Sequence, residues 1–274
     1  MYTFVVEKPD VTAAWIAACT ELDRRTNPDR TAFHTVVRIT DPSKDDATFR
    51  SDLERVRERA LPADDYATIE TVANTIFPRA LAASSGSHAD LVTRYRNMYG
   101  RVRLFPKNHR DTYFGRLIAY PGPGSKPPID QLGKVIERLK SEAASRGPMT
   151  AAYEVDVAHP AFDSEIADDP ILSMDAHVHR GGHDNYTRGF PCLSHCSFQL
   201  EKGRTVHLTA FYRYHYMLDK AYGNYIGLGR LLAHVAGCAG LRAGALTVMA
   251  GYAWLEKTRL VRPLLRETEP MVSI

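Results

Sequence analysis

The amino-acid sequence predicts an α+β domain. Three observations lead to this fold class: apolar residues recur at helical spacing in several segments, other segments alternate like strands, and the two kinds do not alternate regularly along the chain. Mixed strands and helices in such an order are typical of α+β domains. The 274 residues are enough for one large domain or two small ones, and we expect a single domain over 1–274.

Apolar residues three and four positions apart predict the helices. The first is expected over roughly 10–25, another over roughly 129–139 after a Pro/Gly-rich turn, and a third over roughly 224–238. Charged residues over 41–59 predict a further exposed helix or a loop. The less polar stretch 69–81 lies between these segments.

Alternating residues predict the strands. The segment 33–39 alternates as one strand, and 196–213 is predicted to form a hairpin whose turn is Glu201-Lys202-Gly203. In the second arm Val206, Leu208, Ala210 and Tyr212 share one face. The polar stretch 160–188, rich in His and Asp, is predicted to be a long surface loop.

Composition narrows the function classes. The chain is 44% hydrophobic and 24% charged, as soluble globular proteins are, and its formal charge of +3 is too small to indicate a nucleic acid or membrane partner. Neither a signal-peptide pattern nor an apolar stretch long enough for a membrane span is visible. Four cysteines (Cys19, Cys192, Cys196 and Cys238) are too few for a disulfide framework, so reduced thiols in the cytoplasm are expected.

One block of the sequence carries a recognisable pattern around a cysteine. It runs Pro191-Cys192-Leu193-Ser194-His195-Cys196-Ser197-Phe198-Gln199-Leu200, followed by Gly203, Arg213 and Asn224, with the last two eleven residues apart. Earlier blocks are Asp29-Arg30-Thr31, Tyr113-Phe114-Gly115-Arg116, Ala119-Tyr120-Pro121, Ile129-Asp130-Gln131-Leu132 and Ser145-Arg146. In order and spacing these blocks, which lie mostly within 112–256, resemble the thymidylate synthase and pyrimidine hydroxymethylase superfamily.

This resemblance implies a mixed sheet flanked by helices, in a homodimer that associates through the sheet. It also implies that the Cys192 thiolate adds to C6 of a pyrimidine, which makes C5 a nucleophile toward an activated one-carbon unit. The implied donor is 5,10-methylenetetrahydrofolate, and the product carries a methyl or a hydroxymethyl group. A nearby guanidinium lowers the pKa of a thiol, and the resemblance places Arg213 in that position.

The resemblance also assigns the substrate contacts. Arg30, Arg213 and, from a second copy of the chain, Arg146 would bind the phosphate of a pyrimidine nucleoside monophosphate, which suits the planar guanidinium fork. Asn224 would read the base edge because an amide both donates and accepts. Tyr113 and Glu70 are the candidates for ordering water or protons.

Several positions depart from the family pattern. Trp254 and Glu256 stand where the family has a His and a sugar-binding Tyr, so Glu256 is the candidate acceptor for ribose hydroxyls. Gly147 replaces the second arginine of the pair, and the folate-stacking tryptophans have no counterpart between 80 and 112. The losses fall on the sugar and folate sides, whereas the thiol and phosphate side is retained.

Alternatives remain open. Cys192 could be a structural thiol, Ser194 could occupy the nucleophile position in a shifted alignment, and Asn224 could cap a helix. The histidines His177, His179 and His183 could bind a metal ion in a hydrolase. A retired enzyme that binds a nucleotide or a partner protein without covalent chemistry is the other alternative.

Overall fold

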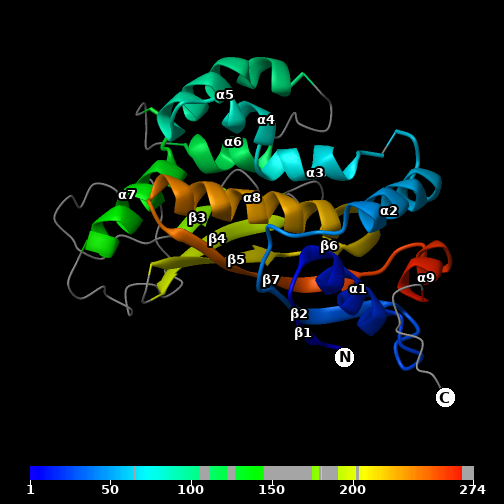
Figure 1. Ribbon diagram of the computed structural model, residues 1–274. Coiled ribbons are helices and arrows are strands. Elements are labelled where there is room, and N and C mark those ends of the chain that lie inside the picture. Colours follow the sequence, from blue (N-terminus) through cyan, green and yellow to red (C-terminus); the bar gives the residue numbers. More distant parts are fainter. Residues whose placement is uncertain are drawn as a thin grey trace.

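The computed structural model describes residues 1–64, 66–104, 111–121, 127–144, 175–178, 180, 191–201 and 204–266, and at Asp175 and His177 the backbone alone (Figure 1). This part of the chain forms a seven-stranded sheet. Its strands are β1 (Val5–Lys8), β2 (Thr31–Ile39), β3 (Asp175–His177), β4 (Leu193–Glu201), β5 (Thr205–Tyr212), β6 (His215–Tyr216) and β7 (Arg242–Trp254).

The sheet is mixed. Its order is β1-β2-β7-β5-β4-β3, and β6 pairs with β7 off this path. The pairs β1/β2, β5/β7 and β6/β7 are parallel, whereas β2/β7, β3/β4 and β4/β5 are antiparallel. This mixed sheet with its helices is consistent with the α+β class that the sequence predicts.

The helices are α1 (Val11–Leu22), α2 (Ala47–Ala60), α3 (Ile69–Ile76), α4 (Arg79–Ala83), α5 (His88–Val102), α6 (Tyr113–Ile118), α7 (Gln131–Ala144), α8 (Tyr222–Cys238) and α9 (Thr258–Arg266). A π-helical turn, η4 (Met217–Ala221), leads directly into α8. Figure 1 shows α8 lying along one face of the sheet, with α3, α5 and α6 in a layer beyond it. Within the described ranges no helix covers the opposite face.

The two faces of the sheet differ accordingly. The face under α8 is fully buried at Phe198 of β4, Leu208 of β5 and Leu246 of β7. On the opposite face, which we call the outer face, aligned residues of five strands form one row across the sheet: Val5, Val36, Met249, Phe211 and His195. The rings of His195 and Phe211 stack there with their centroids 4.2 Å apart.

Helix starts and helix contacts follow local sequence. The side chain of Asp10 accepts a hydrogen bond from the amide of Ala13, 2.8 Å away, and so caps α1. The close packing of α3 on α8 depends on Gly223 and Gly227. A Cβ at Gly223 would lie 2.7 Å from Val72 Cβ, and one at Gly227 would lie 2.7 Å from the Ala73 carbonyl oxygen.

The predicted helices over 10–25, 129–139 and 224–238 and the predicted hairpin are confirmed by α1, α7, α8 and the pair β4/β5. The charged stretch forms α2, so its helical alternative is correct. The loop prediction is wrong at Asp175–His177, where β3 pairs with β4. The cap prediction for Asn224 is also wrong, because α8 begins two residues earlier, after η4.

Candidate functional site

Cys192 and Arg213 lie at adjacent ends of β4 and β5. The amide of Arg213 donates to the carbonyl oxygen of Cys192 at 2.8 Å. A β-bulge lies next to this contact, because Leu193 pairs with Tyr212 while His195 already pairs with Phe211. At the bulge, β4 therefore carries one residue more than the facing part of β5.

The additional residue is Ser194. Its hydroxyl donates to the carbonyl oxygen of Phe211 at 2.9 Å, so it serves the pairing of β4 with β5. The sulfur of Cys192, one bulge away, is only partly buried and is a free thiol. Of the two alternatives for the nucleophile, this geometry favours Cys192.

Two cations act on the Cys192 thiol. Burial raises the pKa of Cys192 above its ordinary value, whereas the charges of Arg213 and Lys220 lower it. Arg213 itself is exposed at the end of β5. Because burial is the largest of these effects, the thiol is neutral at pH 7, and the two cations favour its ionised form.

Tyr113 lies beside the backbone of Cys192 and Leu193. It is the first residue of α6, whose N-cap is Thr112, with the Thr112 hydroxyl accepting from the Gly115 amide at 3.1 Å. The amides of Cys192 and Leu193 hydrogen-bond to the Tyr113 phenol, and burial raises the pKa of that phenol strongly. Tyr113 is therefore a neutral hydroxyl next to the sulfur.

Exposed aromatic rings flank the same end of the sheet. Tyr216 and Trp254 are 36% and 37% exposed, with ring centroids 6.1 Å apart. Tyr214 packs behind them at 4.5 Å from Tyr216. Burial raises the pKa of both tyrosines, and a thiolate at Cys192 raises it further. Such ring faces can stack on a planar ligand.

The turn η4 holds Lys220 near the thiol. Its ammonium group lies 3.0 Å from a carboxylate oxygen of Asp219. Arg57, a buried residue of α2, donates to the carbonyl oxygens of Leu218 at 3.1 Å and Asp219 at 2.8 Å. The backbone of η4 is therefore fixed from α2.

Glu256 also fixes the backbone of η4, by accepting hydrogen bonds from its amides. Its two carboxylate oxygens accept from the amides of Leu218 at 2.9 Å and Asp219 at 3.1 Å. Burial raises the pKa of Glu256, although these amide donors lower it. Both oxygens that were predicted to accept from ribose hydroxyls are thus bonded to the backbone.

Asn224 and His215 form a buried polar pair beneath the site. The side-chain amide of Asn224 lies 3.2 Å from His215 Nε2, and the His215 ring stacks on Tyr212 at 4.5 Å. Burial lowers the pKa of His215 to about 3, so the imidazole is neutral. Burial raises the pKa of Tyr212 strongly, and a thiolate at Cys192 would add to this effect.

Arg30 is engaged at the start of β2. Its side chain lies 2.9 Å from an Asp23 carboxylate oxygen and donates to the carbonyl oxygens of Arg24 and Asn27 at 2.7 and 2.6 Å. A second arginine, Arg262 of α9, contacts the same Asp23. Phosphate binding by Arg30 would have to compete with these contacts.

Glu70 lies in a different charge environment from Cys192. It is the second residue of α3 and forms a bidentate ion pair with Arg230 of α8, both distances being 2.8 Å. The Arg230 hydrogen bond is the main reason that the pKa of Glu70 is lowered, with Arg79 contributing. The cations beside the thiol are instead Arg213 and Lys220.

Some predicted residues lie outside the described part of the chain. These are Arg146, Gly147, His179 and His183, and of His177 the backbone alone is described, in β3. Among the described residues no group of three or more His, Cys, Asp and Glu side chains could hold a metal ion.

Sequence reasoning missed Lys220, Arg57 and Tyr214. Lys220 lies seven residues after Arg213, within the interval that carries the family spacing, and this position was the only signal for it. Arg57 belongs to a charged stretch whose pattern indicates solvent exposure, so its burial could not be predicted from sequence.

No protein-family model and no curated protein matches this chain. None of the helices in the described ranges is both long and apolar enough to cross a membrane.

Proposed function

We propose that this chain is a divergent thymidylate synthase-like enzyme that transfers a one-carbon unit to C5 of a pyrimidine nucleoside monophosphate. The observation that supports the proposal is the placement of the Cys192 thiol within reach of two cations, Arg213 and Lys220. The neutral hydroxyl of Tyr113 lies next to the backbone of Cys192. A partly buried thiol that cations bias toward the thiolate is the arrangement that conjugate addition requires.

In the proposed reaction, the Cys192 sulfur forms a bond to C6 of the pyrimidine, and the electron pair of the C5–C6 double bond moves toward C5 and O4. C5 then bonds to the one-carbon unit and the C5 proton leaves, while the bond from that carbon to its donor nitrogen breaks. Hydride or water adds to the same carbon, and elimination of the thiolate restores the C5–C6 double bond. Methylenetetrahydrofolate would supply that carbon at the formaldehyde oxidation level. Hydride from the folate would give a methyl product, and water a hydroxymethyl product.

The described residues fit planar ligands at this place. Tyr216 and Trp254 offer exposed ring faces beside the thiol, although the family's own stacking tryptophans are absent. Arg213 would bind the phosphate, with Arg30 and the Arg146 of a second copy as further candidates. Asn224 remains the candidate for the base edge and Glu70 for proton transfer. A sugar contact by Glu256 would have to compete with the amides of Leu218 and Asp219, which its two oxygens already bind.

The proposal includes a homodimer formed through the outer face of the sheet. Its row of Val5, Val36, Met249, Phe211 and His195 supports this, because Val5 is 74% and Met249 37% exposed. A largely apolar row that no helix of the described ranges covers is typical of an association surface. A reactive thiol also requires a reducing compartment, which is why we propose the cytoplasm.

The test is release of tritium from C5-labelled uridylate, deoxyuridylate and their cytidine equivalents, with and without methylenetetrahydrofolate. We expect release by the native protein and by Cys238→Ala, a control that removes another partly exposed thiol. Cys192→Ala should release none. Mass spectrometry of the nucleotide then distinguishes a methyl from a hydroxymethyl product. Tritium release by Cys192→Ala would contradict the proposal.

One observation favours a second candidate, a nucleotide-binding protein without covalent chemistry. Burial raises the pKa of Cys192 in spite of the two cations, so the thiolate is the minor form at neutral pH. Calorimetry with the same nucleotides separates the two candidates. Binding without tritium release from any of them would favour the second.

A further inference from the structure

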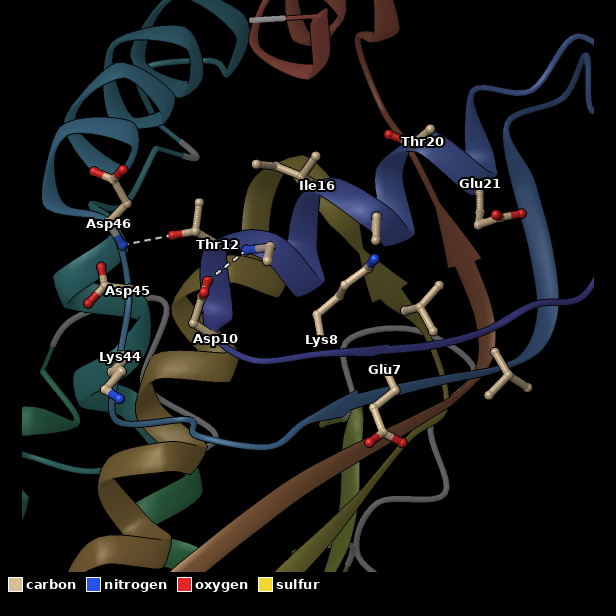
Figure 2. Close-up of a pocket in the computed structure, with 14 residues that line it drawn as sticks. Glu7, Lys8, Asp10, Thr12, Ile16, Thr20, Glu21, Lys44, Asp45 and Asp46 are labelled. Atoms are coloured by element: carbon tan, nitrogen blue, oxygen red, sulfur yellow. Dashed lines mark hydrogen bonds between the residues drawn. The ribbon is translucent and has the colours of Figure 1, made fainter. Parts of the chain in front are cut away.

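A surface cleft of about 1000 Å³ lies between β1 and α1, apart from the Cys192 site. It is lined by the whole of β1, by one side of α1 and by the segment Lys44-Asp45-Asp46 (Figure 2). Nothing in the proposed reaction uses this cleft.

One wall of the cleft is the free edge of the sheet. β1 is the terminal strand of the order and pairs on one side with β2. The carbonyl oxygens of Phe4 and Lys8 accept hydrogen bonds at 3.0 Å from the amides of Val36 and Thr40, respectively. The backbone polar groups of Phe4 and Lys8 therefore point toward β2. Because strand backbone alternates, Val5 and Glu7 direct their N–H and C=O groups outward, along the cleft. In the part of the chain that the structure describes, no strand pairs with these groups.

The other wall is a helix face of small and apolar side chains. Ala13, Ile16, Ala17 and Thr20 follow one another at helical spacing along the side of α1 that faces the cleft, and none of them is buried. The buried side of α1 is formed instead by Val11, Trp15, Ala18 and Leu22. The small side chains leave room beside the strand edge for another chain.

The polar lining is predominantly acidic. Its carboxylates are Glu7, Asp10, Glu21, Asp45 and Asp46, against the cations Lys8 and Lys44. Lys44 is paired with Asp41, 2.9 Å away. Three of the carboxylates are also paired with arginines: Glu7 with Arg38, Asp45 with Arg50, and Glu21 with Arg24. Those of Asp10 and Asp46 accept from backbone amides, which carry no net charge. Figure 2 shows Asp45 and Asp46 at one end of the cleft and Glu21 at the other, so a ligand lying along β1 meets carboxylates at both ends.

From these observations we infer that the cleft binds an extended basic segment of a partner protein, which adds to the sheet as a strand beside β1. Outward N–H and C=O groups are satisfied by another strand, and a helix lying over the edge forms the side of such a groove. The four residues of β1 span about 13 Å at ~3.3 Å per residue, so about four partner residues pair with it. Alternate side chains of that segment are apolar and face α1. Those between them are Lys or Arg on the face of Glu7, and basic residues at the two ends of the segment meet the carboxylates there.

The test uses a fluorescently labelled, end-blocked peptide in which Lys and Val alternate over seven residues. Binding to the full chain is measured by fluorescence anisotropy at low and high salt. Val5→Pro removes one outward N–H and leaves the hydrogen bonds to β2 intact, because Val5 does not face β2. Val5→Ala is the matched control, since it shortens the side chain but keeps the N–H.

We expect saturable binding that weakens with salt, at least tenfold weaker affinity for Val5→Pro, and little change for Val5→Ala. Ala17→Arg should also weaken binding, because the larger side chain fills the groove and its positive charge repels the lysines of the peptide. Equal binding by Val5→Pro and Val5→Ala would overturn the strand-addition proposal. Equal binding of a peptide with Glu in place of Lys would overturn its charge preference. If sedimentation shows a dimer that Val5→Pro but not Val5→Ala dissociates, the occupant is a second copy of β1 instead.

Discussion

Arg57 and Glu256 hold the same residue, Leu218, from opposite sides. Arg57 Nε donates to the Leu218 carbonyl oxygen at 3.1 Å, and a Glu256 oxygen accepts from the Leu218 amide at 2.9 Å. Both side chains are buried. The π-helical turn that carries Lys220 is therefore fixed by one cation and one anion from distant parts of the sequence.

Removal of Arg57 should destabilise the protein strongly. Arg57→Leu leaves the carbonyl oxygens of Leu218 and Asp219 without this donor and the Glu54 carboxylate without its cation. We expect this to lower the free energy of unfolding by about 3–5 kcal/mol. Arg57→Lys keeps the charge but not the planar fork, so an intermediate loss is expected. Urea unfolding measures both. A loss below about 1 kcal/mol for Arg57→Leu would contradict the assigned contacts.

The reactivity of Cys192 should report its two cations. Because burial raises the pKa of the thiol, alkylation of Cys192 by iodoacetamide should increase with pH beyond the range in which an exposed thiol is already ionised. Lys220→Gln removes a charge that lowers this pKa, so the midpoint should move to higher pH. Lys220→Arg should restore it. Peptide mass spectrometry follows the modified cysteine, and an unchanged midpoint in Lys220→Gln would exclude Lys220 from the site.

Stability should fall in acid because of His215. Burial lowers the pKa of His215 from 6.5 to about 3, so between these values the unfolded chain binds a proton that the folded chain does not. The free energy of unfolding should then decrease as pH falls, by about 1.4 kcal/mol per pH unit from this group. His215→Gln should remove that part of the slope. The pKa of His234 is lowered to about 4, mainly by burial, so the part of the slope that comes from His234 should remain in this variant.

Substitution of Glu70 should distinguish a structural role from a catalytic role of this residue. Its side chain is 53% exposed, and exposed ion pairs contribute little, so Glu70→Gln should change the free energy of unfolding by less than about 1 kcal/mol. If Glu70 only pairs with Arg230, tritium release by Glu70→Gln should match that of the native protein. Loss of release with unchanged stability would instead support the catalytic role that the resemblance implies.

The outer face can be tested for dimerisation with one substitution. Met249→Asp places a charge in the centre of the apolar row, and an unpaired charge at an interface core is costly. We expect sedimentation velocity to show a dimer for the native protein and a monomer for Met249→Asp. Met98→Asp is the matched control, because Met98 is equally apolar and 44% exposed but lies on α5. Dissociation by both variants would point to general destabilisation.

The sequence alone determined the elements whose pattern is local. The periodicity of α1, the alternation of β4 and β5, and the spacing from Cys192 to Arg213 depend on residues close together in the chain, so they could be read directly. The strand β7 was not predicted. Its stretch Arg242–Trp254 contains five alanines and glycines within its first ten residues, which have low strand preference, and its pairing with β2 and β5 overrides that preference.

Only the tertiary structure decided which groups surround the thiol. Arg57 lies 161 residues from Leu218, and Glu256 lies 38 residues from it, yet these contacts place Lys220 beside Cys192. The charge pattern assigned Arg57 to a solvated face, and the resemblance made Glu256 a candidate for the sugar. Neither a pattern nor a resemblance reports the distant partner of a side chain. A buried charge depends on that partner for its energy, so its role becomes visible once the chain is folded.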